Sequence, residues 1–258
     1  MSEQSYVEFH ELDLNSSNLE ALSDDQFAVL SVLCFAVSEV NTFRKCYVSS
    51  LFPETGSLTI QSALRQHQFT IMRTWSAKLY ECSVFIKKLA KNQSGLKDSD
   101  VKSWADESWK AFTSNHTGEG YEVAKWLRNE VSNHYSIKAA RDNRKHIPAK
   151  FDLKFYTHEN GGNDFFPLGE GVLFHARLNR RWANLNTEQE KTKMFGEWLE
   201  WNISTTDWLL AEHAKFADQF VFKKLADLSW KPTSYEVPKQ MIDRDLTSKA
   251  PIFLERSR

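Results

Sequence analysis

Apolar residues recur every three or four positions along most of this chain, a spacing that places them on one face of an α-helix. The first apolar stripe covers 24–49 and follows Ser23, a residue type that caps helix starts. A second stripe begins at Leu58 and continues to 92–95, where polar residues and a glycine interrupt it. The pattern predicts two long consecutive helices.

Three further helical segments follow from the same spacing. The first opens at Asp98 and ends among the turn residues 115–120, and the next starts near Tyr121. The last covers about 187–229 and begins with a Thr-Glu-Gln-Glu capping sequence. Together the five segments predict a mainly α fold.

Residues 151–175 follow a different pattern. Phe151, Leu153 and Phe155 alternate with polar residues, as on a half-buried β-strand. A polar, glycine-containing stretch at 158–164 then reads as a tight turn. The alternation predicts a small β-hairpin inserted near 151–175 in an otherwise helical chain.

The limits of the helical pattern divide the 258 residues into three parts. We expect an N-terminal extension at 1–22, one helical domain at 23–230 and an extended C-terminal tail at 231–258. Apolar residues make up 41% of the chain, which is enough to fill a core. Eighteen phenylalanines and nine tryptophans against nine glycines and six prolines also favour helix packing over a turn-rich sheet.

Charge and cysteine content limit the partners and the compartment. The formal net charge of −1 gives the chain no overall attraction for nucleic acid, so such binding needs a local basic patch. Three cysteines cannot all pair, which favours free thiols in a reducing compartment. No apolar run reaches the roughly 18 residues of a membrane helix, and the N-terminus does not resemble a signal peptide. We expect a cytoplasmic protein with no membrane contact.

Several common catalytic motifs are missing from the sequence. It contains no glycine-rich phosphate loop, no CxxC pair, no HExxH and no GxSxG. Seven histidines lack a second His or Cys three or four positions away, so no metal site within one helix and no cofactor is expected. These are His10, His67, His116, His146, His158, His175 and His213.

The segment 126–135 places an arginine, an amide and a histidine at one helix end. RNA cleavage without a metal needs a group that exchanges protons near neutral pH and a fixed positive charge at the phosphate. His134 fits the first role as general base or acid, and Arg128 fits the second because arginine keeps its proton. Asn129 is expected to orient the histidine or the phosphate, and Tyr135 is expected as a secondary contact.

One copy of this helix makes a poor site. Residues six positions apart lie roughly 120° from each other around a helix, so Arg128 and His134 do not point the same way. Two copies that meet across a two-fold axis would bring both arginines and both histidines into one cleft. The sequence therefore predicts a homodimer with a composite site.

The spacing Arg128-Asn129-x4-His134 resembles the R-x4-6-H motif of the HEPN superfamily, in the form where a polar residue follows the arginine. The motif also lies late in a long helix of a mostly helical chain, as in that superfamily. The resemblance implies an antiparallel, up-and-down helical bundle, a homodimer, and a metal-independent endoribonuclease that leaves a 2′,3′-cyclic phosphate. Many HEPN proteins are toxins or antiviral effectors, so it also implies an antitoxin or another operon-encoded partner.

One branch of the superfamily departs from this sequence. Toxins that pair with nucleotidyltransferase antitoxins carry R-x4-H-x-Y, whereas the spacer here has five residues and Tyr135 follows His134 directly. The resemblance therefore does not extend to inactivation by modification of that tyrosine.

A basic cluster follows the motif and supplies the local patch that the net charge does not. It consists of Lys138, Arg141, Arg144, Lys145, His146 and Lys150. Such residues would flank the cleft and contact RNA phosphates. Arg177 with Arg180 and Arg181 gives a weaker indication, because these residues lie beyond the predicted hairpin. Two alternatives stay open: an ordinary solvated helix face, or a HEPN-like module that binds RNA, nucleotide or protein without cleavage.

Overall fold

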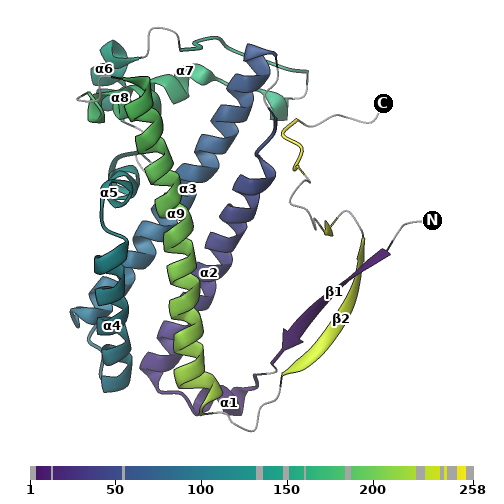
Figure 1. Cartoon of the computed structure of the whole chain (residues 1–258), viewed down its shortest axis with the longest axis vertical. Coiled ribbons are helices and arrows are strands. Elements are labelled where there is room, and N and C mark those ends of the chain that lie inside the picture. Colours follow the sequence, from purple (N-terminus) through teal and green to yellow (C-terminus); the bar gives the residue numbers. More distant parts are fainter. Residues whose placement is uncertain are drawn as a thin grey trace. The chain divides into compact units, whose positions relative to one another are not determined.

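The chain folds mainly as helices (Figure 1). The structure is a computed structural model that describes residues 4–12, 14–53, 56–131, 136–147, 151–159, 161–183, 187–224, 230–238, 241–242 and 249–253. Within these residues the only sheet has two antiparallel strands. The prediction of a mainly α chain with a small pair of strands is confirmed.

Four long helices correspond closely to the predicted ones: α2 (Asp24–Ser49), α3 (Leu58–Ala90), α4 (Ser99–Asn115) and α9 (Glu188–Ala217). The expected cap of α9 is present, since the backbone N–H of Glu190 donates to Thr187 Oγ1 at 3.1 Å. The backbone N–H of Thr187 donates in return to Glu190 Oε2 at 2.8 Å. The shorter helices are α1 (Ser16–Glu20), α5 (Glu119–Trp126), α6 (Ile137–Asn143), α7 (Pro167–Glu170) and α8 (Ala176–Arg181).

The chain forms two compact units, and α2, α3 and α9 each contribute a segment to both. Unit 1 comprises Met1–Glu39, Cys82–Asn115 and Thr206–Ser248. Unit 2 comprises Val40–Glu81, His116–Thr205 and Lys249–Arg258.

Unit 1 is held together by aromatic rings from α4 and α9. The rings of Trp104 and Phe216 meet edge to face with centroids 4.8 Å apart, and those of Phe112 and Trp208 are also 4.8 Å apart. The Glu212 carboxylate is buried beside them and accepts a hydrogen bond from the Ser108 hydroxyl. Its desolvation is thus compensated by a partner.

The two ends of the chain pair with each other in unit 1. Strand β1 (Gln4–Glu11) runs antiparallel to β2 (Lys231–Pro238), with Val7 opposite Tyr235. The Phe9 and Tyr235 rings on one face of this ribbon lie 6.0 Å apart. Both strands lie in segments predicted as an N-terminal extension and an extended tail, because pairing between distant segments leaves no local signal.

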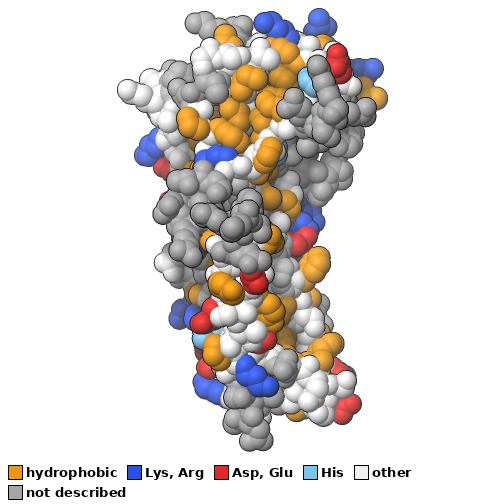
Figure 2. Space-filling model, turned by 90° about the vertical axis from the view of Figure 1, so that its right-hand side faces the viewer, with side chains coloured by type: hydrophobic (Ala, Val, Ile, Leu, Met, Phe, Trp, Pro, Cys, Tyr) orange, Lys and Arg blue, Asp and Glu red, His pale blue; other side chains and the backbone are white. Residues whose placement is uncertain are grey.

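Helix α2 is long and apolar enough to cross a membrane, by length and composition alone. Its most apolar 18 residues have a mean hydropathy of 1.5, although Ser31, Ser38 and Glu39 interrupt the apolar run. Core helices of globular proteins meet the same criterion, and Val29 and Leu33 of α2 are buried. Other side chains of α2 are exposed, and Figure 2 shows hydrophobic side chains reaching the surface on one face of the molecule.

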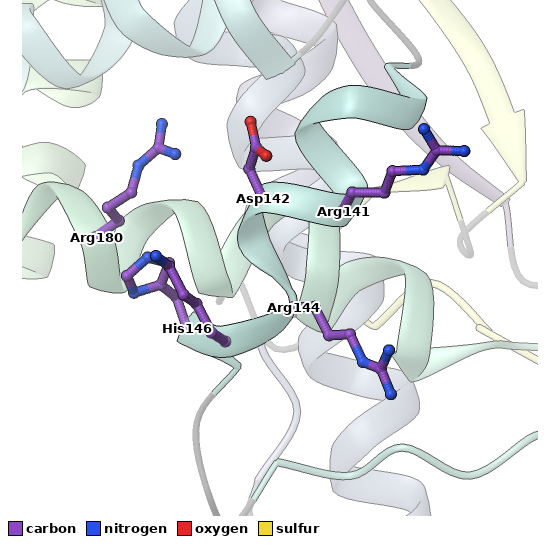
Figure 3. A pocket seen from close by; sticks show the side chains of 6 residues that line it. Arg141, Asp142, Arg144, His146 and Arg180 are labelled. Carbon is purple, nitrogen blue, oxygen red and sulfur yellow. The ribbon is translucent and has the colours of Figure 1, made fainter.

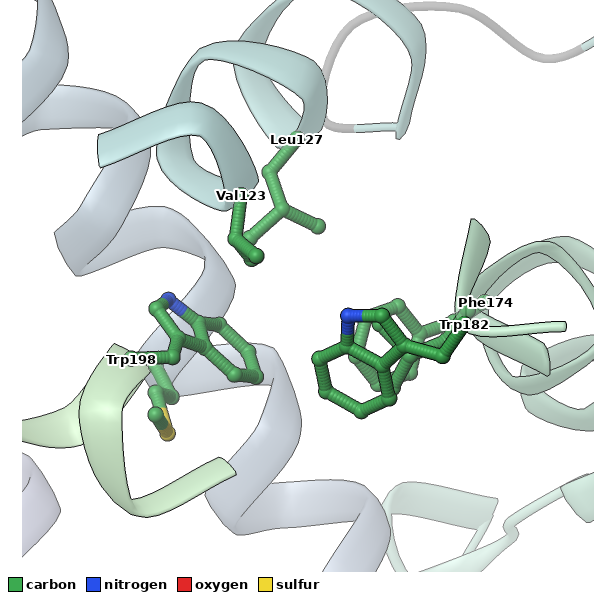
Figure 4. Packing of buried hydrophobic residues seen from close by; sticks show 7 residues of the cluster. Val123, Leu127, Phe174, Trp182 and Trp198 are labelled. Carbon is green, nitrogen blue, oxygen red and sulfur yellow. The ribbon is translucent and has the colours of Figure 1, made fainter. Parts of the chain in front are cut away.

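Unit 2 has its own apolar core, in which side chains of α5, α8 and α9 converge (Figure 4). Trp198 of α9 is fully buried there, and its Nε1 donates to Ser76 Oγ at 2.8 Å. Gly120 of α5 permits a close approach, because a Cβ at this position would lie 2.4 Å from Trp201 Cβ. The core consists of Met72, Val123, Leu127, Phe174, Leu178, Trp182 and Trp198.

The predicted hairpin at 151–175 is reduced to one antiparallel bridge. Tyr156 and Phe165 exchange two backbone hydrogen bonds of 3.1 Å, and their rings stack with centroids 4.4 Å apart. The expected return strand is helical instead, which corrects that part of the prediction. Pro167 occupies the first turn of α7, where its fixed φ favours a helix. Phe174 and Leu178 then recur at helical spacing and are buried.

Candidate functional site

Helix α5 continues into a wider, π-helical turn, η1 (Leu127–Val131). Such turns are uncommon and frequently occur at functional sites. Leu127 is fully buried in the core of unit 2, so it fixes the direction of the two following side chains. Arg128 is about half exposed and Asn129 is exposed, as a surface site requires.

Two neighbours orient the Arg128 guanidinium. Its Nε donates to the carboxylate of Glu81 on α3, and its Nη1 donates to Asn129 Oδ1 at 3.1 Å. The side chains of Arg128 and Glu81 are 42% and 46% exposed, so water screens this ion pair. Neither contact uses Nη2.

Three predicted site residues, His134, Tyr135 and Lys150, lie outside the described residues. The structure thus brings Arg128 and Asn129 together and does not test their relation to the histidine. The composite site of a homodimer stays a prediction for the same reason.

Helix α6 carries the basic cluster and is anchored at both ends. The Ser136 hydroxyl caps its start by accepting the backbone N–H of Ala139 at 3.1 Å. At its end Asn143 is buried, and its Nδ2 donates to the carbonyl of Val172 at 3.1 Å. A 3-10 turn, η2 (Arg144–His146), follows directly. Hydrogen bonds at both ends therefore hold in place the backbone that carries the exposed cations of this segment.

A hollow of about 740 Å³ lies between this segment and α8 in unit 2. Figure 3 shows Asp142 between Arg180 and Arg141, with His146 on the same side as Arg180. The Asn179 side chain holds the two walls together, because its Nδ2 donates to the carbonyl of His146 at 3.2 Å. The lining residues are Arg141, Asp142, Arg144, Lys145, His146 and Arg180. Lys138 is exposed on α6 and does not line the hollow.

Arg180 lines the hollow although its sequence position gave only a weak indication of a functional role. A strand ending at 175 would have separated it from the basic cluster, whereas α8 brings it to η2. The available signal was the helical spacing of Phe174, Leu178 and Trp182, all of which are buried.

Several cations elsewhere in unit 2 have carboxylate partners. Arg181, next in sequence to Arg180, pairs with Glu119 at 3.2 Å, and Lys125 pairs with Glu122 at 3.1 Å. In contrast, the cations that line the hollow form no ion pair with any residue that the structure describes. Among the residues that the structure describes, Asp142 is the one carboxylate that lines the hollow.

A second charged cluster lies in the interior of unit 2. Arg73 of α3 pairs with Glu170 of α7, and its guanidinium lies 4.7 Å from the centre of the Phe174 ring. Burial raises the pKa of Glu170 although Arg73 acts in the opposite direction. Burial also lowers the pKa of His175 to about 4, and the charges of Arg73 and Arg65 add to this effect. His175 is therefore neutral near pH 7.

Metal-ligating side chains do not gather in the described part of the chain. No three His, Cys, Asp or Glu side chains there are placed to hold one ion. Candidate chemistry in these residues thus rests on the arginines, the amide and the basic hollow.

No known family model matches this chain, and comparisons with the curated proteins and with the solved structures found no match. The resemblance to the HEPN superfamily therefore rests on the motif residues and on the helical context.

Proposed function

We propose that this protein is a metal-independent endoribonuclease of HEPN type that acts in the cytoplasm as a homodimer. The observation that supports this proposal most is the Arg128 guanidinium, which is oriented by Glu81 and Asn129 and is still half exposed. An oriented arginine at the surface suits stabilisation of a charged transition state, because little reorganisation is needed when the substrate binds.

In the proposed reaction, His134 takes the proton of an RNA 2′-hydroxyl and the 2′-oxygen attacks the adjacent phosphorus. The bond from phosphorus to the 5′-oxygen breaks, and that oxygen receives a proton from His134 of the partner subunit. The products are a 2′,3′-cyclic phosphate and a free 5′-hydroxyl. Arg128 stabilises the negative charge on the phosphorane oxygens, Asn129 holds the guanidinium, and Tyr135 is a secondary contact.

RNA would reach this site along the basic surface of α6 and η2, where Lys138, Arg141, Arg144 and Lys145 are exposed. Lys150 is assigned to the same surface from its sequence position. A toxin or antiviral effector is the cellular role that such a nuclease would have, with an antitoxin or operon-encoded protein as its regulator.

A second candidate function is RNA binding without cleavage. It is favoured by the contrast between Arg128, whose charge is compensated by Glu81, and the unpaired cations of the hollow. In that case the basic surface would bind RNA, and the motif residues Arg128, Asn129 and His134 would have no catalytic role.

Cleavage assays separate the two candidates. Single-stranded and structured RNA are incubated in EDTA with the wild type and with His134→Ala, Arg128→Gln and Lys125→Gln. Lys125→Gln is the matched control, because it removes an ion-paired cation from α5 just before the motif. We expect cyclic-phosphate products from the wild type and the control, and rates lower by about 10² to 10⁴ with the two motif variants. Molar mass from light scattering should be that of a dimer.

Two outcomes would contradict the nuclease. Intact RNA with the folded, dimeric wild type would favour the binding module. Equal cleavage by the wild type and both motif variants would show that another protein in the sample or another site cleaves the RNA.

A further inference from the structure

We infer that the hollow in unit 2 binds the phosphodiester backbone of a single RNA strand, and that Arg180 and His146 belong to this binding site. The inference rests on the proposed function, since it states where the RNA of that site is held. Arg180 comes from α8, a segment that the sequence alone did not connect to the basic cluster.

The first argument is charge. The hollow brings Arg141, Arg144, Lys145 and Arg180 together without ion pairs among the described residues. The chain as a whole has a formal net charge of −1, so this concentration of cations is local. Like charges held together cost free energy unless an anion compensates them. A concave surface also raises the local concentration of anions.

The second argument is rigidity. The wall formed by α6 and η2 is fixed by the buried Asn143, which binds the Val172 carbonyl, and by Asn179, which binds the His146 carbonyl. The backbone positions of the cations are therefore set before a ligand binds. Such preorganisation lowers the entropic cost of association.

The third argument is the chemistry of the lining. The lining consists of three arginines, one lysine, one histidine and one aspartate, and it contains no Phe, Tyr, Trp or aliphatic side chain. Its cations suit phosphate oxygens, whose contacts carry no sequence information. A volume of about 740 Å³ is in the range of small-ligand pockets, so we expect one strand to fit it better than a duplex.

Binding is measured by fluorescence anisotropy with labelled 2′-O-methyl RNA of mixed sequence, which lacks the attacking hydroxyl and stays intact. For a single strand, log K falls with log[salt] by about 0.7 per phosphate contact. We expect Arg180→Gln, Arg141→Gln and Arg144→Gln each to reduce this slope by about 0.7. At roughly 50 mM salt each should weaken binding about 5- to 10-fold.

Two further variants sharpen the test. Asp142→Asn removes the one carboxylate among the described lining residues and should tighten binding several-fold, an effect that damage to the fold would not produce. Lys193→Gln is the control, because it removes an exposed cation of α9 that pairs with Glu197 outside the hollow. It should leave both affinity and salt slope unchanged. A duplex of the same sequence should bind more weakly than the single strand.

The outcomes distinguish this inference from the proposed function. If Arg180→Gln weakens binding and the wild type leaves natural RNA uncleaved, the hollow is the RNA-binding site and the protein is not a nuclease. Normal cleavage with unchanged affinity in Arg180→Gln, Arg141→Gln and Arg144→Gln would overturn the hollow and leave the nuclease standing. Equal losses in Arg180→Gln and Lys193→Gln would also overturn it, since general electrostatics would then suffice.

Discussion

The helical segment from Pro167 to Arg181 carries charged side chains in two different environments. Towards the interior, Glu170 pairs with Arg73, and their side chains are only 10% and 16% exposed. At the surface, Arg180 lines the hollow and forms no ion pair with a described residue. Two arginines in one unit thus have contrasting surroundings.

The difference separates charges that support the fold from charges that can bind a ligand. A buried cation without its carboxylate would be strongly unfavourable, so Arg73 and Glu170 depend on each other. Exposed cations without partners contribute little to the stability of the fold, and their clustering opposes it. Their gathering in a hollow is therefore better explained by a ligand than by structure.

The largest expected effect comes from breaking the interior pair. Glu170→Gln leaves the Arg73 guanidinium largely buried without a compensating charge, and we expect the free energy of unfolding to fall by about 3 to 5 kcal/mol. Urea denaturation measures this change. RNA affinity of the folded fraction should not change. Glu197→Gln, at an exposed ion pair of α9, is the control and should shift stability by less than about 1 kcal/mol.

A similar loss in both variants would show that the interior pair is no more important than a surface pair. If folded Glu170→Gln binds RNA more weakly, the interior cluster is part of the binding site, and interior and surface charges do not have separate roles.

His175 gives the second effect, which depends on pH. Its pKa is about 4 in the folded state and about 6.5 when unfolded, so between these values the unfolded chain binds a proton that the folded chain does not. With respect to His175, the folded state therefore has its full stability above pH 6.5, and it loses part of this stability as the pH falls to 4. The loss should reach roughly 3 kcal/mol. It is measured by denaturation at several pH values.

A comparison of two histidine variants separates the titration of His175 from that of other groups. His175→Phe, placed among Phe69, Phe151 and Phe174, should flatten the pH dependence between 4 and 6.5. His67→Gln changes an exposed histidine of α3 and should keep the wild-type dependence. Identical slopes in the wild type and His175→Phe would contradict the assignment of His175 as a buried neutral residue.

Most of the fold could be predicted from the sequence because helices leave a local signal. The spacing of apolar residues gave α2, α3 and α4 with limits near those of the structure. It also gave the start of α9, whose cap was visible in four residues, but α9 ends at Ala217 and not near 229. The segment after Pro167 was misassigned, because two short apolar runs beside glycines resemble strands as much as a buried helix. The pairing of β1 with β2 was missed since it joins segments more than 200 residues apart.

The site was predictable in part for the same reason. Arg128 and Asn129 are adjacent in sequence, and their contact is local. Arg180 joins Arg141 only through tertiary packing of α8 against η2, which no periodicity encodes. Glu81 was not anticipated either, because its contact with Arg128 joins two distant helices.

Arg128 combines features of Arg73 and Arg180, because it forms an ion pair and its side chain is partly exposed to solvent. If the pair with Glu81 only positions the guanidinium, Arg128→Gln should change the free energy of unfolding by less than about 1 kcal/mol. RNA cleavage should nevertheless fall by about 10² to 10³. Glu81→Gln should be as stable and should lower cleavage less, because Asn129 still holds Nη1.

A double-mutant cycle of Arg128→Gln and Glu81→Gln measures how strongly the two groups stabilise each other. A coupling energy below about 1 kcal/mol, as for exposed pairs, would leave Arg128 available to a phosphate and place it with the hollow cations. A coupling of about 3 kcal/mol or more would place it with Arg73 instead. Arg128 would then be a structural residue, and RNA binding at the hollow would have to stand without cleavage at the motif.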